Sequence, residues 1–229
     1  MKALVLGGSG HLGGHVLARL ASEGVDTTFT WWTNEAAAVT LEAAGHRGLR
    51  VDLRDADALA AALEDVGPID ALIHCAATNR WAPLAELSVA EFDEALAVTV
   101  RAAFVACRSV VPGMAARGAG SVVFAAGLVA DRLVPAPAHY AASQAALLGL
   151  ARSIAKEHGK QGVRANLVAI SDLSGGLQAS ADPALIANYL EHAALGRRGT
   201  ADEAARAIVW LALHGSYASG SVLPVTGGL

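Results

Sequence analysis

The sequence is poor in charge, in cysteine and in aromatic side chains. Charged residues make up 17% of its 229 residues and aromatic residues 5%, whereas apolar residues reach 54%. This balance excludes an intrinsically disordered chain, because such chains are rich in charge and poor in apolar side chains. The two cysteines, Cys75 and Cys107, are too few for a disulfide framework or a thiolate metal site, and they suit a reducing compartment.

Basic clusters and long apolar runs are also missing. With a net charge of −4 and no cluster of lysines or arginines, the chain is not expected to bind nucleic acid or an anionic membrane surface. It has no uninterrupted run of about 18 apolar residues and no charged leader before a cleavable segment, so we expect a cytoplasmic protein outside the membrane. The 8 histidines are dispersed and predict no metal site.

What the sequence does contain is a regular alternation of short apolar runs and amphipathic segments. The runs predict strands over Ala3–Leu6, Val25–Trp31, Gly48–Val51, Asp70–Ala76, Ser121–Ala126, Arg164–Ile170 and Val222–Thr226. The amphipathic segments predict a helix with an apolar face from Leu12 to Leu20, and others over Glu35–Ala44, Asp55–Asp65, Val89–Arg117 (one helix or two), Tyr140–Gly159, Asp182–Ala194 and Asp202–Leu213.

This order predicts an α/β fold in a single domain, residues 1–229. We expect one doubly wound, mostly parallel Rossmann-type sheet of about seven strands flanked by helices. Ser171–Pro183 has no clear pattern and is rich in serine and glycine. Because it follows the carboxyl end of a strand, where ligand loops of such sheets lie, we expect it to be a substrate loop.

The glycine-rich turn after the first strand is the strongest local motif. Gly7, Gly10 and Gly13 follow the apolar run Ala3–Leu6 and precede a predicted helix. Glycine lets the backbone approach a ligand closely, and the helix offers free N–H groups to a phosphate. The arrangement is typical of the opening of a dinucleotide-binding βαβ unit, although a tight turn without a ligand stays open.

Motifs along nearly the whole chain resemble the short-chain dehydrogenase/reductase family, in particular its β-ketoacyl-acyl-carrier-protein reductases. They are the glycine turn, Asp52–Leu53, Leu72–Ala77, Gly120–Phe124, Tyr140–Leu147, Gly162–Asn166, Gly196–Thr200 and Val225–Leu229. The resemblance implies NADP or NAD as cofactor, with no metal. It implies a cofactor site formed by Gly7, Ser9, Gly10, His11, Leu12, Gly13, Trp32, Asp52, Leu53 and Ala76.

The resemblance also implies a catalytic group of Asn, Ser, Tyr and Lys, of which this chain keeps one member. Tyr140 matches the tyrosine that acts as acid and base. Gln144 replaces the lysine, Gly127 the serine and Thr99 the asparagine. His139, His74 and Thr99 are the substitute helpers that we consider beside Tyr140, since an imidazole titrates near neutral pH.

The cofactor motifs depart from the family as well. His11 stands where the family's turn has its middle glycine. At the end of the second strand, the stretch Trp31–Asn34 supplies neither a base for a 2′-phosphate nor an acid for a free ribose. Trp32 can stack on an adenine or simply cover the edge of the sheet. Binding of NADP, of NAD or of neither therefore stays open.

Three functions follow as hypotheses. The first is a ketoreductase-like homologue that is non-catalytic or weakly active, a subunit or partner of an active 3-oxoacyl reductase of the fatty-acid or polyketide type. The second is an NAD(P)H-dependent reductase of a carrier-protein-bound or polyketide-like ketone, using Tyr140 with non-standard helpers. The third is a non-redox dehydratase, isomerase or cyclase in the same cleft.

The expected partners follow from the same resemblance. The helical ranges Val89–Arg117 and Tyr140–Gly159 are rich in alanine and would pack across a dimer axis in this family. We expect a homo-oligomer, or a hetero-oligomer with an active ketoreductase relative, and contact with an acyl carrier protein. Neither nucleic acid nor a membrane is an expected partner.

Overall fold

A computed structural model describes residues 1–178 and 183–229 of the chain, and its centre is a parallel sheet. The 7-stranded sheet has the order β3-β2-β1-β4-β5-β6-β7. Its strands are β1 (Lys2–Leu6), β2 (Asp26–Trp31), β3 (Arg47–Arg50), β4 (Ala71–His74), β5 (Gly120–Gly127), β6 (Val163–Ile170) and β7 (Val222–Val225). Each pairing between neighbouring strands is parallel, so the predicted doubly wound sheet is confirmed.

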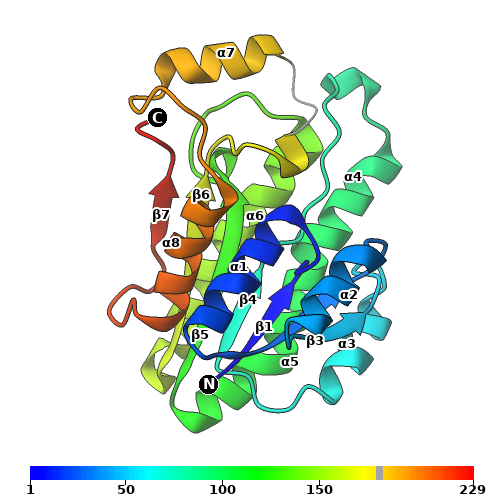
Figure 1. The fold of residues 1–229 in the computed structure, drawn as a ribbon, viewed down its shortest axis with the longest axis vertical. Helices are drawn as coiled ribbons and strands as arrows, with labels where there is room; N and C mark the ends of the chain where they lie inside the picture. The colour runs from blue at the N-terminus through cyan, green and yellow to red at the C-terminus, as the bar shows by residue number, and fades with distance from the viewer. Residues whose placement is uncertain (179–182) are drawn as a thin grey trace.

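Helices cover both faces of the sheet (Figure 1). They are α1 (His11–Ser22), α2 (Glu35–Ala43), α3 (Ala56–Glu64), α4 (Val89–Ala95), α5 (Ala102–Arg117), α6 (Ala138–His158), α7 (Pro183–His192) and α8 (Ala201–Leu213), with a π-helical turn, η2 (Leu96–Arg101), between α4 and α5. The start of the predicted helix Asp182–Ala194 lies outside the described residues.

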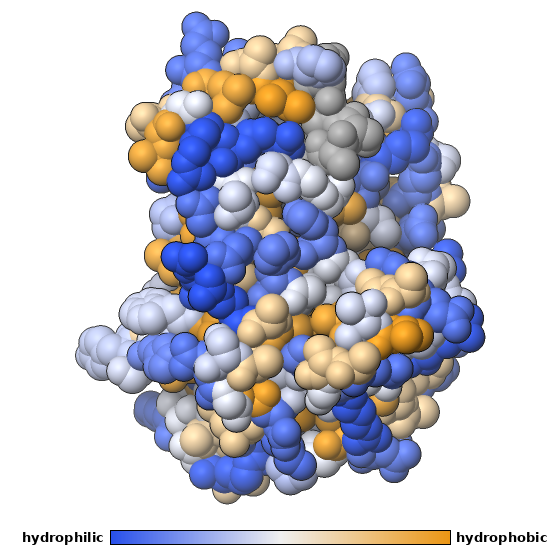
Figure 2. Space-filling model, in the orientation of Figure 1, coloured by the Kyte–Doolittle hydropathy of each residue, from blue (hydrophilic) through white to orange (hydrophobic). Residues whose placement is uncertain are grey.

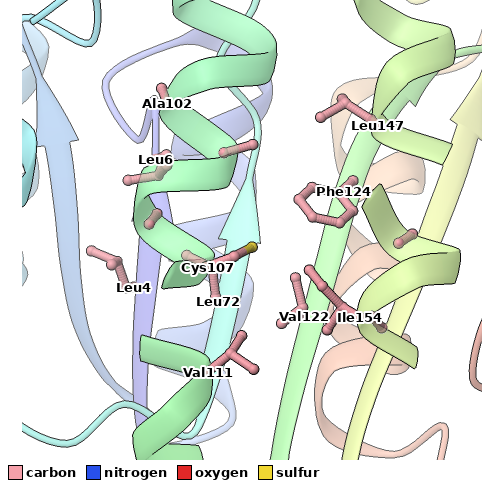
Figure 3. Close-up of a cluster of buried hydrophobic side chains, with 14 of the residues drawn as sticks. Leu4, Leu6, Leu72, Ala102, Cys107, Val111, Val122, Phe124, Leu147 and Ile154 are labelled. Atoms are coloured by element: carbon pink, nitrogen blue, oxygen red, sulfur yellow. The ribbon is translucent and has the colours of Figure 1, made fainter. Parts of the chain in front are cut away.

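Two buried clusters join these layers. On one face, α5 and α6 pack on the sheet through residues such as Leu72, Val111, Phe124 and Leu147, as Figure 3 shows. On the other face, α1 and α8 pack through a second cluster that contains Leu17 and other aliphatic residues. The parallel strands are buried on both faces, which explains why they read as continuous apolar runs rather than as alternating ones.

The turn between β1 and α1 brings two glycines into contact. Gly7 has a φ of +77°, a conformation that other residues rarely adopt, and a Cβ at Gly13 would lie 2.2 Å from the Gly7 carbonyl oxygen. The Gly7 N–H donates to the Thr30 hydroxyl at 2.9 Å, and the Gly8 N–H donates to the Thr30 carbonyl at 3.0 Å. These bonds hold the turn against β2 and direct the N-terminus of α1 toward the carboxyl edge of the sheet.

The helical run Val89–Arg117 is the longest apolar stretch among the described residues. Its 29 residues are long and apolar enough to cross a membrane by length and composition, and 44% of the tested window is buried in the fold. The run packs against α3 and α6. A core helix of a folded domain gives this same signal, and we interpret it as one.

Several predicted boundaries are corrected by the structure. The fourth strand was expected over Asp70–Ala76, but β4 covers only Ala71–His74. The chain leaves the sheet after His74, because Cys75 and Ala76 line a cavity at the strand ends. The sixth helix begins at Ala138 rather than Tyr140. Pro137 occupies its N-cap, so the helix includes His139 in its first turn.

The glycine contact predicts a sharp difference between two neighbouring glycines. Gly13→Ala should destabilise the fold by about 2 kcal/mol or more, because the new methyl group would meet backbone that cannot move aside. At Gly14 a Cβ would have no atom closer than 3.9 Å, so Gly14→Ala should be neutral or stabilise by about 0.5–1 kcal/mol through its helix propensity. Urea unfolding of both variants measures the difference, and equal midpoints would contradict this account of the turn.

Candidate cofactor and active site

A cavity of about 560 Å³ lies at the carboxyl ends of the strands. Its volume falls within the range of about 300–1,000 Å³ that small-molecule and cofactor sites occupy. Of the predicted cofactor residues, the cavity is lined by Gly7, Ser9, Gly10, His11, Leu12, Trp32, Asp52, Leu53 and Ala76. Gly13 does not line it, because this residue packs against Gly7 instead. The cavity spans the point where the strand order reverses, the usual ligand site of such sheets.

The N-terminus of α1 fits a phosphate group. Gly10 is the N-cap of this helix and provides no side chain to cap it. The first N–H groups of a helix have no intrahelical partner, and they carry the positive end of the helix dipole. Because Gly7, Gly10 and Leu12 line the cavity, these donors lie beside space that a pyrophosphate can occupy. The residues present therefore fit a dinucleotide at this turn.

His11 links this turn to the segment that follows β6. Its Nε2 atom lies 3.0 Å from the carbonyl oxygen of Ser174. The next residues, Gly175 and Gly176, pack so closely on the imidazole ring that a Cβ at Gly175 would lie 3.0 Å from Nε2. The side chain that replaces the family's glycine thus bounds the cavity on the side of the predicted substrate loop.

Another part of the cavity wall carries two tryptophans and an arginine, Arg54. Trp31 and Trp32 line it, and Trp32 is 43% exposed. Arg54 forms a bidentate pair with Asp52 at 2.7–3.0 Å and approaches Glu94 at 3.4 Å. The hydrogen bond from Arg54 lowers the pKa of Asp52, so this carboxyl group is ionised and paired at neutral pH.

Tyr140, Gly127 and Gln144 meet where α6 faces the end of β5, and all three line the cavity. The Gly127 N–H donates to Gln144 Oε1 at 2.9 Å, while Gln144 Nε2 is buried without a hydrogen-bond partner in the described structure. A Cβ at Gly127 would lie 2.6 Å from the Tyr140 hydroxyl oxygen. The phenol therefore occupies the space in which the expected serine side chain would begin.

The phenol of Tyr140 is not activated by its surroundings. Burial raises the pKa of Tyr140 to about 12, and no cation in the described structure opposes that shift. A phenol with a raised pKa stays protonated at neutral pH and is a weaker acid than a free tyrosine. The site can thus donate a hydrogen bond to a carbonyl oxygen, but it disfavours the phenolate that alcohol oxidation requires.

The three suggested helpers lie outside the cavity, which corrects our expectation that they assist Tyr140 there. His74 and Thr99 are fully buried, and His139 is 2% exposed. His139 faces Arg80, whose backbone N–H lies 3.4 Å from its Nε2. The imidazole of His74 packs against Phe124 with ring centroids 6.4 Å apart. At a strand end and a helix start, the sequence does not reveal to which side these side chains point.

A second cavity of about 320 Å³ adjoins the first, and Tyr140 lines both. Its walls are largely apolar and include Trp81, Leu128, Val134, Leu185 and Ile186. The last two belong to α7, and Figure 2 shows apolar side chains gathered over this helix at the top of the view. The second cavity therefore offers an apolar compartment beside the Tyr140 phenol.

Several lining residues were missed by the sequence analysis. They are mostly small or apolar residues at strand ends and in the segment after β6: Cys75, Ala77, Thr78, Val98, Ala125, Leu173, Gly175 and Gly176. Burial raises the pKa of the Cys75 thiol to about 12, so it is not a nucleophile. Arg54 could have been found, because Asp52 and Arg54 are spaced for a local ion pair directly after the third strand.

The buried imidazole of His74 predicts a pH dependence of stability. Burial lowers its pKa from 6.5 to about 4. The unfolded chain therefore takes up a proton at a higher pH than the folded chain, and stability falls as the pH drops below 6.5. This group alone should cost about 2 kcal/mol between pH 7 and pH 5.

Urea unfolding at both pH values tests this for the wild type and for His74→Leu. Between pH 7 and pH 5, the unfolding free energy of His74→Leu should fall by about 2 kcal/mol less than that of the wild type. His15→Gln replaces an exposed histidine and is the matched control, which should follow the wild type. A His74→Leu variant with the full wild-type pH dependence would contradict the assignment.

Comparisons with known proteins agree with this geometry. The family model described as Enoyl-(Acyl carrier protein) reductase matches residues 11–229. The 3-oxoacyl-[acyl-carrier-protein] reductase MabA of Mycobacterium avium is 30% identical over 233 residues, which cover 100% of this chain and 89% of the relative.

Two solved structures with bound cofactors are similar throughout. A blue fluorescent protein from a metagenomic library, in complex with NADPH, has a TM-score of 0.87 at 29% identity, with 99% of this chain and 96% of that chain covered. A gluconate 5-dehydrogenase from Burkholderia cenocepacia, in complex with NADP and tartrate, has a TM-score of 0.91 at 26% identity, with 100% and 94% covered. With its parallel sheet, glycine turn and Tyr140 at the cavity, the chain belongs to the short-chain dehydrogenase/reductase family and resembles the β-ketoacyl-acyl-carrier-protein reductases.

Proposed function

We propose that this protein binds a nicotinamide dinucleotide in the larger cavity and is a ketoreductase-like family member with little or no hydride transfer of its own. It would act as a subunit or partner of an active 3-oxoacyl reductase. The uncapped N-terminus of α1 and the cavity of about 560 Å³ support the binding. The NADPH and NADP complexes of the two similar structures support it as well.

The contact of Gln144 with Gly127 is the observation that supports slow or absent hydride transfer. In place of a cation beside the phenol, α6 presents a neutral amide whose oxygen is held by a backbone N–H at 2.9 Å. No hydroxyl group stands at residue 127 to donate to a carbonyl oxygen. One such donor is worth about 2.7–4 kcal/mol of transition-state stabilisation. Reduction of a ketone is therefore expected to be slow by at least two orders of magnitude.

One observation favours a working reductase as the second candidate. Tyr140 lines both cavities, so its hydroxyl group can reach the oxygen of a carbonyl group placed between a cofactor and an apolar acyl chain. A protonated phenol can donate a proton in the reductive direction. In this case the substrate would be a carrier-protein-bound or polyketide-like ketone.

Restoring the missing groups separates the two candidates. The variant Gly127→Ser with Gln144→Lys should reduce a generic 3-oxoacyl thioester at least 100-fold faster than the wild type, measured as NADPH consumption. Both changes are needed together, because a serine Cβ would lie 2.6 Å from the present position of the Tyr140 hydroxyl and the phenol must move. Adding Tyr140→Phe to this variant should abolish the gain.

The outcomes of that experiment are distinct. If the wild type consumes NADPH with the 3-oxoacyl thioester as fast as the restored variant does, the proposal of a weakly active protein is overturned in favour of the working reductase. A restored variant that binds NADPH, unfolds at the wild-type urea concentration and yet shows no gain would contradict the catalytic argument altogether.

We also propose that a second copy of this chain packs on the outer face of α4 and α5. Phe104 is 51% exposed there and Phe92 is 40% exposed. Phe104 borders a surface hollow that also contains Leu96, Val100 and Leu150. Apolar patches of this kind on a folded domain are typical of interfaces.

Phe104→Glu tests the assembly, because it places a charge at the centre of this patch. Light scattering after size exclusion should show an oligomer for the wild type and a monomer for the variant. Val39→Glu is the control, since Val39 is 59% exposed on α2, away from the patch, and should leave the oligomer intact. A wild-type monomer that pairs only with an active reductase relative would assign the face to that partner instead.

A further inference from the structure

The third strand places an arginine beside two tryptophans that line the large cavity. Strands β2 and β3 pair in parallel with Trp31 opposite Arg50, and the Val51 N–H continues the ladder by donating to the Trp31 carbonyl at 2.9 Å. This register holds Arg50 beside the tryptophan pair. Its guanidinium carbon lies 5.3 Å from the Trp31 ring centroid and 5.5 Å from that of Trp32.

These distances are those of cation–π contacts, which fix a guanidinium group without using its N–H donors. A planar guanidinium with free N–H groups is the side chain best suited to bind a phosphate with two hydrogen bonds. Arg50 forms no ion pair within the described part of the chain. Its donors therefore remain available to a ligand.

Arg50 does not itself line the cavity, but the residues next to it do. Trp31, Trp32 and Val51 all line it, as do Thr33 and Asn34 at the start of α2. Both polar atoms of Asn34 are already engaged, with Nδ2 donating to the Ser9 carbonyl and Oδ1 accepting from the Ala37 N–H. Arg50, beside the tryptophans of this rim, is a cation that forms no ion pair within the described residues.

The other basic residues near this edge are committed elsewhere. Arg54 is paired with Asp52 and lies near Glu94. Arg47 stands at the opposite end of β3 and donates to the Asp65 carbonyl at 3.3 Å. Glu35 and Glu42 on α2 are exposed, and neither forms an ion pair with Arg50 within the described residues.

We propose that Arg50, held by Trp31 and Trp32, binds the 2′-phosphate of the cofactor's adenosine and makes this protein selective for NADP(H) over NAD(H). The base is thus provided by β3 although the end of β2 provides none. This inference rests on the proposed cofactor binding, and it assigns to the tryptophans a positioning role toward Arg50. Attraction between a guanidinium and a phosphate dianion should weaken with ionic strength.

Nucleotide fragments test this without any hydride transfer. Calorimetry with 2′,5′-ADP and 5′-AMP compares ligands that differ by the 2′-phosphate alone. The wild type should bind 2′,5′-ADP at least about tenfold more tightly. Arg50→Gln should reduce the affinity for 2′,5′-ADP to that for 5′-AMP, while the affinity for 5′-AMP stays unchanged.

Two variants serve as controls with the same change of charge. Arg47→Gln lies on the same strand and should keep the wild-type preference. Arg54→Gln should also keep most of it, and loss of the preference in this variant alone would assign the role to Arg54 and overturn the proposal. Because Arg50 is exposed on an edge strand, its replacement should leave the urea midpoint within experimental error of the wild type.

The remaining outcomes separate this inference from the proposed function. If NADH and NADPH both bind and the wild type shows no preference for the 2′-phosphate, the role of Arg50 is refuted and cofactor binding stands. If Arg50→Gln weakens both fragments equally, Arg50 is not specific for the 2′-phosphate. If neither cofactor nor either fragment binds, the proposed function itself fails, and this inference fails with it.

Discussion

The contact of Gly13 with the Gly7 carbonyl lets α1 begin directly beside the end of β1, at the edge of the cavity. With a side chain at residue 13, α1 could not begin so close to the end of β1. Its N-terminus would then point away from the strand ends. The bidentate pair of Arg19 with Asp202, at 2.7 Å, holds the far part of the same helix against α8. The helix is therefore fixed at both ends, and its free N–H groups keep one orientation toward the cavity.

Gly127, Tyr140 and Gln144 at the end of β5 are packed against one another. Gln144 has a length that lets its amide oxygen reach the Gly127 N–H, and the missing Cβ at Gly127 leaves room for the Tyr140 phenol. A serine alone at residue 127 would collide with that phenol. The three positions thus form one packed arrangement, so its chemistry cannot be inferred from any single replacement. This is the physical reason why the restored pair, rather than either single variant, is informative.

Much of the fold could be predicted from the sequence, and less of the site. Apolar runs and glycines mark the strands and the turn because both reflect local requirements of the backbone. The burial of His74 and His139 could not be predicted, because it depends on which side of a strand end or helix start the neighbouring layer covers. The position of Arg50 beside Trp31 could not be predicted either, since it depends on the register between two strands that the helix α2 separates in the chain.

The two halves of the cavity consequently differ in what they retain. The half built from β1, β2, β3 and α1 has the first N–H groups of α1 at the cavity and Arg50 beside its tryptophans, and such groups can attract an anion. The half built from β5 and α6 presents Gly127 and Gln144 beside a Tyr140 phenol whose pKa is raised by burial. Binding and catalysis use different interactions, so the first can persist at full strength without the second.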